Sequence, residues 1–226
     1  MPITVGNTVT SASLTVATAN PYTLALTNNK NTVIVAVAIR DTRTAAVVST
    51  ASYGGVTMTQ EITRLRTDGD TTEDLRVYIF RLSNAPTGAN NISITLDSTA
   101  EYWAVFGIAC DRITNIGQPN ISGGADADST AGTDPSVVIV TTSKDAILID
   151  CVYNKSGTSM TAGTSQIIVY QVLVNGGTDR ALMGYKIVST VGSQTSTYTE
   201  TADDDWCMVS AAEKSNLSQE FFQMFY

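Results

Sequence analysis

Residues 31–40 read NTVIVAVAIR, and residues 145–154 read DAILIDCVYN. The two stretches align without a gap at an offset of 114 residues, and weaker similarity continues on both sides of them. Self-similarity of this kind is typical of one structural unit that is used twice. The sequence therefore predicts an internal duplication, with repeat one at about 20–113 and repeat two at about 134–213.

Strand patterns recur at short spacing along the chain. Residues 33–39 are apolar at every position, as in a strand that is covered on both faces. Residues 92–96, ISITL, alternate between apolar and polar side chains, as in a strand with one exposed face. We expect an all-β fold, an antiparallel β-sandwich or jelly roll of about a dozen strands, over residues 1–213. The two repeats are expected to form one fused sandwich with a pseudo-twofold axis.

The composition excludes several classes of function. The net charge is −8, and 13 Lys and Arg residues are scattered along the chain, so we expect neither nucleic acid nor a membrane surface as a partner. Histidine is absent, which excludes Ser-His-Asp, Cys-His and His-zinc sites. No pair of carboxylates stands out as a glycosidase would require. An enzyme is not expected.

Three cysteines, Cys110, Cys151 and Cys207, lie in apolar strand-like stretches. Their odd number favours buried free thiols over a disulfide framework. A Cys151–Cys207 or Cys110–Cys207 disulfide remains an alternative. The N-terminal residues show no secretory signal, and no stretch approaches the roughly 18 apolar residues of a membrane span.

The C-terminal segment 214–226 differs in character from the rest of the chain, because three of the five Phe residues lie in its last six positions. The spacing of its apolar residues favours a short helix or arm whose apolar face must be buried. One possibility is that it folds back on its own sandwich. The other is that it docks on a neighbouring subunit, in which case the partner-binding residues are Leu217, Phe221, Phe222, Met224, Phe225 and Tyr226.

Three stretches together resemble a known module. Residues 52–59, SYGGVTMT, resemble its V-x-Y-G-G-V-x-L-T element, and residues 75–96 resemble its W-x-L-x-N-P-P-x-G element followed by an alternating strand. Residues 205–212, DWCMVSAA, resemble its terminal tryptophan strand. The module is a jelly-roll-like β-sandwich that occurs, here in duplicate, in bacteriophage virion proteins and bacterial surface proteins. The resemblance covers about 8–213 and implies the fold rather than an activity.

Two kinds of side chain suggest ligands. The loop acids Asp68, Asp70, Glu73 and Asp74 have the clustered oxygens that calcium prefers, although solvated loop acids are common; no other metal or cofactor is expected. Aromatic residues could stack on a glycan. Trp103 and Trp206, aligned at an offset of 103, are better interpreted as core, which leaves as exposed candidates Tyr22, Tyr53, Tyr170 and Tyr198.

Together these features predict a non-enzymatic structural protein of a phage particle, such as a capsid decoration, fibre or tail component. It would form a homo-oligomer, contact other virion proteins and be located in the virion, which needs no secretion signal because lysis releases it. The alternative is a carbohydrate-binding or adhesion module assisted by calcium.

Overall fold

The computed structural model describes residues 3–15, 17–42, 46–67, 73–111, 113–117, 125–127, 134–142, 144–202 and 205–215. The strands in these ranges are numbered β1 to β19, more than the dozen expected, and several contain only two or three residues. The helical element among them is the 3-10 turn Asn175–Gly177. All strand pairings are antiparallel, which confirms the predicted all-β antiparallel fold.

The strands form two inner and two outer sheets. The N-inner sheet has the order β1 (Thr4–Thr10), β10 (Tyr102–Asp111), β4 (Thr32–Asp41), β8 (Asp74–Ser83) and β7 (Thr59–Thr67), and β2 (Leu14–Thr15) also pairs with β10. The N-outer sheet has the order β3 (Tyr22–Asn28), β9 (Gly88–Leu96), β5 (Val48–Tyr53) and β6 (Val56–Thr57). The C-inner sheet has the order β11 (Ile113–Gly117), β19 (Trp206–Ser215), β14 (Ala146–Asn154), β17 (Asp179–Val188) and β16 (Gln166–Val174), and β12 (Ala125–Ala127) pairs with β19. The C-outer sheet has the order β13 (Ser136–Thr141), β18 (Gly192–Thr199) and β15 (Thr161–Ala162).

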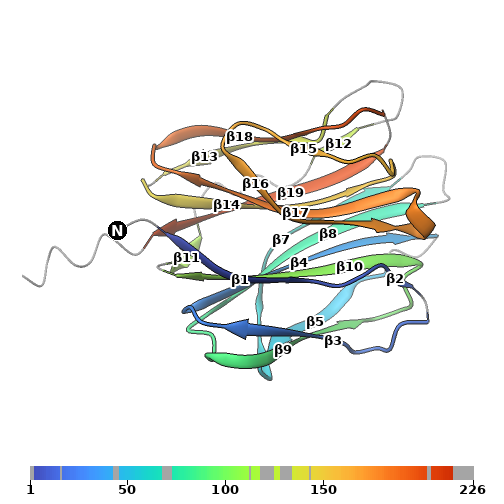
Figure 1. Cartoon of the computed structure of the whole chain (residues 1–226), viewed down its shortest axis with the longest axis horizontal. Coiled ribbons are helices and arrows are strands. Elements are labelled where there is room, and N and C mark those ends of the chain that lie inside the picture. Colours follow the sequence, from blue (N-terminus) through green and yellow to red (C-terminus); the bar gives the residue numbers. More distant parts are fainter. Residues whose placement is uncertain are drawn as a thin grey trace, which may run out of the picture.

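The four sheets stack as four layers, with the two inner sheets face to face in the middle (Figure 1). One apolar core fills the space between the inner sheets, and it includes Ile34 and Phe106 on one side with Ile149 and Val209 on the other. One further core lies between each inner sheet and its own outer sheet. The molecule is thus two β-sandwiches that share a buried interface.

Hydrophobic pattern explains the layer that each strand occupies. β4 is buried at all ten positions, which confirms that the apolar stretch 33–39 is covered on both faces. β9, in an outer sheet, buries Ile92, Ile94 and Leu96 and turns the residues between them outward. A strand with two apolar faces needs a neighbouring layer on each side, whereas an alternating strand needs only one.

The two halves have corresponding sheet orders, because β10, β4 and β8 occupy the places of β19, β14 and β17. This correspondence supports the duplication, which remains a prediction. The alignment at offset 114 is nevertheless wrong in register. It matches Val33, which packs toward the N-outer sheet, with Ile147, which packs between the inner sheets. An offset of 115 preserves the direction of the side chains. It matches Ile39, which lies opposite Trp103 in its ladder, with Asn154, which lies opposite Trp206.

The prediction of one fused sandwich is also wrong. Each described ladder joins strands of the same half, so the halves form separate sandwiches that pack through side chains. The proposed arm begins within the last strand, since β19 extends to Ser215. The rest of the arm, residues 216–226, lies outside the described residues.

Candidate functional site

Six charged side chains meet at one end of the interface between the inner sheets. They come from positions where strands enter or leave the two sheets, three from each half of the chain. Successive members carry opposite charge and form five ion pairs. The order of this ion-pair chain is Asp179, Arg40, Glu73, Lys155, Asp205 and Arg66.

Three of the five ion pairs join the two sandwiches directly, and all six side chains are at most about one-fifth exposed. Charges that are this far from water contribute to stability only when each one is paired. The distances across the interface are 2.6 Å from Arg40 Nη1 to Asp179 Oδ2, 2.7 Å from Arg66 Nη2 to Asp205 Oδ1 and 3.0 Å from Lys155 Nζ to Glu73 Oε2.

Asp179 is the most heavily bonded member of the ion-pair chain. Besides Arg40, its carboxylate accepts hydrogen bonds from Tyr153 Oη at 2.9 Å, Asn175 Nδ2 at 3.1 Å and Thr178 Oγ1 at 2.9 Å. Asn175 and Thr178 belong to the 3-10 turn and its end, so the turn between β16 and β17 is shaped around this carboxylate. Arg40 also lies 5.8 Å from the centre of the Tyr102 ring, a cation–π contact.

Pairing within the ion-pair chain favours the charged forms of Arg40, Glu73 and Lys155. Burial alone would lower the pKa of Arg40, but the hydrogen bonds that it donates to Asp179 and Glu73, together with their negative charges, outweigh burial and raise the pKa. Burial would raise the pKa of Glu73, but its bonds with Lys155 and Arg40 lower it. Pairing with Glu73 and Asp205 likewise raises the pKa of Lys155, although burial would lower it. A general acid or base requires a pKa close to neutrality. These groups are suited to holding the sandwiches together rather than to moving protons.

Two of the four calcium candidates, Glu73 and Asp74, lie among the described residues. Asp68 and Asp70 lie outside the described residues, while the Glu73 carboxylate is already engaged by Arg40 and Lys155. Asp74 begins β8 and lies opposite Asp41 in the ladder with β4. Within the described ranges, no group of three or more Cys, Asp or Glu side chains is arranged to hold a metal ion. Calcium binding stays a prediction.

A second charged cluster lies toward the opposite end of the interface. Arg81 Nε on β8 is 2.8 Å from Glu61 Oε1 on β7 and 3.5 Å from Glu213 Oε1 on β19. Glu213 is 1% exposed, and neither of its carboxylate oxygens has a hydrogen-bond donor among the described residues. Burial and, to a lesser degree, the charge of Glu61 raise the pKa of Glu213 to about 8, against the effect of Arg81.

We expect Glu213→Gln to flatten the pH dependence of stability between about pH 5 and pH 8. The folded protein keeps the Glu213 proton up to about pH 8, whereas the unfolded chain loses it near 4.5. The folded state therefore binds more protons in this window, and the free energy of unfolding falls as the pH rises, by about 1.4 kcal/mol per pH unit for one proton. Urea unfolding at several pH values measures the slope. Asp97→Asn, which removes the same charge from a group whose lowered pKa lies below this window, should retain the slope; an unchanged slope in Glu213→Gln would contradict the assignment.

A buried carboxyl group links the C-inner sheet to the C-outer sheet. Asp150, fully buried in the middle of β14, accepts hydrogen bonds from Tyr198 Oη at 2.8 Å and Gln166 Nε2 at 3.0 Å. Burial raises its pKa. Gly184 lies opposite Asp150 on β17, and a Cβ there would be 2.1 Å from Tyr198 Oη, so glycine makes room for the tyrosine hydroxyl. This network is closed to solvent and can bind no substrate.

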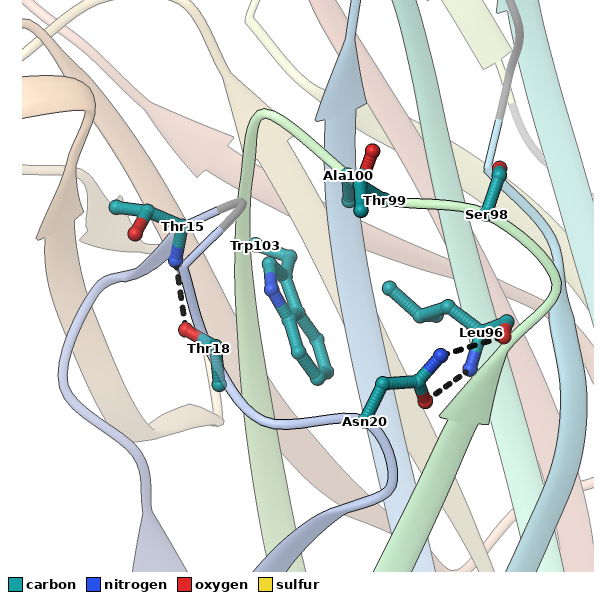
Figure 2. A pocket seen from close by; sticks show the side chains of 8 residues that line it. All are labelled: Thr15, Thr18, Asn20, Leu96, Ser98, Thr99, Ala100 and Trp103. Atoms are coloured by element: carbon teal, nitrogen blue, oxygen red, sulfur yellow. Dashed lines mark hydrogen bonds between the residues drawn. The ribbon is translucent and has the colours of Figure 1, made fainter.

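A shallow hollow of about 230 Å³, which includes its opening to solvent, lies beside Trp103 at the end of the N-terminal sandwich (Figure 2). The Asn20 side chain in its wall is engaged with the backbone, because it donates to the Leu96 carbonyl at 2.8 Å and accepts from the Leu96 amide at 3.1 Å. Trp103 is 3% exposed and packs edge-on against Tyr22. The hollow is therefore not a platform for stacking a sugar. Its lining consists of Thr15, Thr18, Asn20, Leu96, Ser98, Thr99, Ala100 and Trp103.

The structure locates the remaining predicted residues. Trp103 and Trp206 are core residues, as expected. Tyr53 and Tyr198 are fully buried, so their proposed exposure is wrong: each hydroxyl is used inside its own sandwich. Tyr22 and Tyr170 are partly buried. The cysteines are free and buried between the inner sheets, as expected for Cys110, Cys151 and Cys207. The arm residues lie outside the described residues, namely Leu217, Phe221, Phe222, Met224, Phe225 and Tyr226.

The distribution of charge among the layers is unusual. None of the strands of the two outer sheets contains Asp, Glu, Lys or Arg, although these sheets face solvent. Their outward positions carry Thr, Ser, Ala, Asn and Val, as in β18, where Ser193, Thr195 and Thr199 are exposed. Charges lie instead on the inner-sheet strands and in the loops. The strands at both ends of the stack consequently contain no charged side chain.

The chain has little similarity to proteins of known function. No family model matches it, and no curated protein matches it. Among solved structures, a point mutant of Bacillus subtilis oxalate decarboxylase has 11% sequence identity and a TM-score of 0.19, with 93% of this chain and 79% of that chain covered. A similarity this low supports no conclusion about fold or activity. No helix in the described ranges is long and apolar enough to cross a membrane.

Proposed function

We propose that this protein is a non-enzymatic structural component of a virus particle of the bacteriophage type, such as a capsid decoration, fibre or tail protein. The observation that carries the proposal is the ion-pair chain. Its charged groups are paired with one another across the sandwich interface, so they join two sandwiches into one rigid body. A catalytic site would instead place titratable groups with perturbed pKa values in a cleft.

Two further features support a role in assembly. The strands of the outer sheets contain no charged side chain, so another protein surface can cover them without removing water from a charge. The module that 52–59, 75–96 and 205–212 resemble occurs in phage virion proteins, and a fold of this kind is compatible with such a role. In this proposal the two sandwiches form the rigid body, and the C-terminal arm attaches it to a neighbouring subunit through aromatic anchors.

The arm can be tested in the full-length chain. We expect Phe221→Ser combined with Phe225→Ser to reduce the mass of the assembly measured by light scattering while the circular dichroism spectrum stays unchanged. The matched control, Gln219→Ser with Gln223→Ser, alters polar positions of the same segment and should keep the mass of the unaltered chain. If the unaltered chain is a monomer at every concentration, or if the phenylalanine variant keeps its mass and loses thermal stability, the arm is part of its own fold and the proposed attachment is wrong.

A further inference from the structure

β16 is an edge strand with an unusual sequence. It closes the C-inner sheet, where β17 is its one ladder partner in the described part of the chain. Its residues, QIIVYQVLV, include no charge, no glycine and no proline, and Ile167 and Leu173 are 50% and 48% exposed. Natural proteins usually protect such edges with charges, prolines or short strands, because an unpaired edge is a template for another strand.

The corresponding edge of the N-inner sheet shows the usual protection. β7, at that edge, contains Glu61, Arg64 and Arg66 within the sequence TQEITRLRT. β1, the edge nearest to β16, has no charged residue, and its Thr8 hydroxyl lies 3.4 Å from the Tyr170 hydroxyl. One side of the molecule therefore has an edge strand with three charged residues, whereas the edge strands on the other side, β1 and β16, contain none.

Part of β16 is regular enough to pair. A bulge interrupts the ladder between Ile168 and Tyr170, and the pairing with β17 is then continuous over 170–174. Tyr170, Val172 and Val174 pack toward the inner core, which leaves Leu173 on the opposite face of the strand. A bulge protects only its own position, so the segment 170–174 remains available to a further strand.

We propose that β16 pairs antiparallel with β16 of a second copy of this chain, with the twofold axis close to Val172. In this arrangement Leu173 of each copy lies across from Gln171 of the other, and the C-inner sheets of the two copies become one continuous sheet. A second copy fits the charge distribution. The chain carries a net charge of −8, so two copies repel each other at most orientations, whereas this edge meets itself with no charge on either strand.

The inference deepens the proposed function, on which it rests for the expectation that copies associate. It places a contact between copies at β16, separate from the contact proposed for the arm. The two proposals therefore fail separately: the phenylalanine variants test the arm, and substitutions at Leu173 test the edge.

The experiment uses the full-length chain with Leu173→Lys, Leu173→Glu and an equimolar mixture of the two. Leu173 is half exposed, so either substitution is compatible with the fold. Each single variant should dimerise about a hundred-fold more weakly or worse, because two leucines lose their contacts and two like charges lie on the same face. Mixing the variants should restore a dimer, since the lysine and the glutamate at position 173 then lie diagonally across the strand pair as opposite charges on one face.

Val56→Lys is the matched control, because Val56 is 48% exposed on β6 in a different sheet. It should dimerise as the unaltered chain does. Sedimentation velocity over a range of concentrations gives the masses. The proposal is overturned if the unaltered chain is monomeric or trimeric, if Leu173→Lys leaves the dimer intact, or if Val56→Lys disrupts it to the same extent. It is equally overturned if the mixture stays monomeric.

Discussion

Replacing Arg40 with leucine is expected to lower the free energy of unfolding by about 3–5 kcal/mol, the usual cost of removing one partner from a buried ion pair. Arg40 is the cation that bonds both Asp179 and Glu73, and the Asp179 side chain is 3% exposed. Without Arg40, Asp179 keeps hydrogen bonds from neutral donors, but its charge has no counterion among them. Leucine fills much of the same volume, so the loss comes mainly from the uncompensated charge.

Urea unfolding measures this effect as a shift of the transition midpoint at constant slope. The control is Lys144→Met, which changes the net charge by the same amount at an exposed position. Adding Asp179→Asn to the Arg40 variant should recover part of the loss, because the buried charge is then removed as well. A shift below about 1 kcal/mol, the range of surface ion pairs, would show that the ion-pair chain does not hold the sandwiches together.

Gly184→Ala is expected to destabilise the protein by about 3 kcal/mol or more. The added Cβ would lie 2.1 Å from Tyr198 Oη and 3.1 Å from the Ile167 carbonyl oxygen, so Tyr198 must move. Its displacement adds the cost of overpacking, about 1–3 kcal/mol, to the loss of a hydrogen bond to a buried acid, about 1.5–3 kcal/mol if the acid is charged. The acid, Asp150, is completely buried and cannot turn to water for a replacement bond.

A double substitution identifies the cause. Tyr198→Phe removes the hydroxyl that the new methyl group meets, so Gly184→Ala should cost clearly less in that background than in the unaltered chain. Thermal unfolding of the two single variants and the double variant gives the coupling. If the two costs simply add, the alanine acts through the backbone of β17 and not through Tyr198.

Sequence patterns predicted the layers better than the register. Alternation in β9 and the doubly apolar stretch in β4 correctly indicated an outer and an inner strand. The same doubly apolar character explains the error in the repeat alignment. When both faces of a strand are apolar, a shift of one residue costs nothing in the hydrophobic pattern but turns every side chain to the other face. Val33 and Ile147 were matched for this reason although they face different layers.

The ion pairs between the two halves could not be predicted, since their members come together only through the packing of the two sandwiches. Arg40 and Asp179 are 139 residues apart in the chain. Asp150 did give a signal, because a carboxyl group within the apolar sequence AILIDCV must find partners when it is buried. That signal indicates a buried network but does not name Tyr198, which the sequence suggested to be exposed.

The separation of the ladders into two halves has a consequence for synthesis of the chain. All strands of the N-terminal sandwich are complete at Asp111, before any strand of the second sandwich has left the ribosome. The nascent chain can therefore close its first sandwich while the face with Ile34, Ala36 and Ala38 still lacks its cover. Until β14 and its neighbours arrive, this face is an exposed apolar sheet, the kind of surface on which folding intermediates aggregate or bind chaperones.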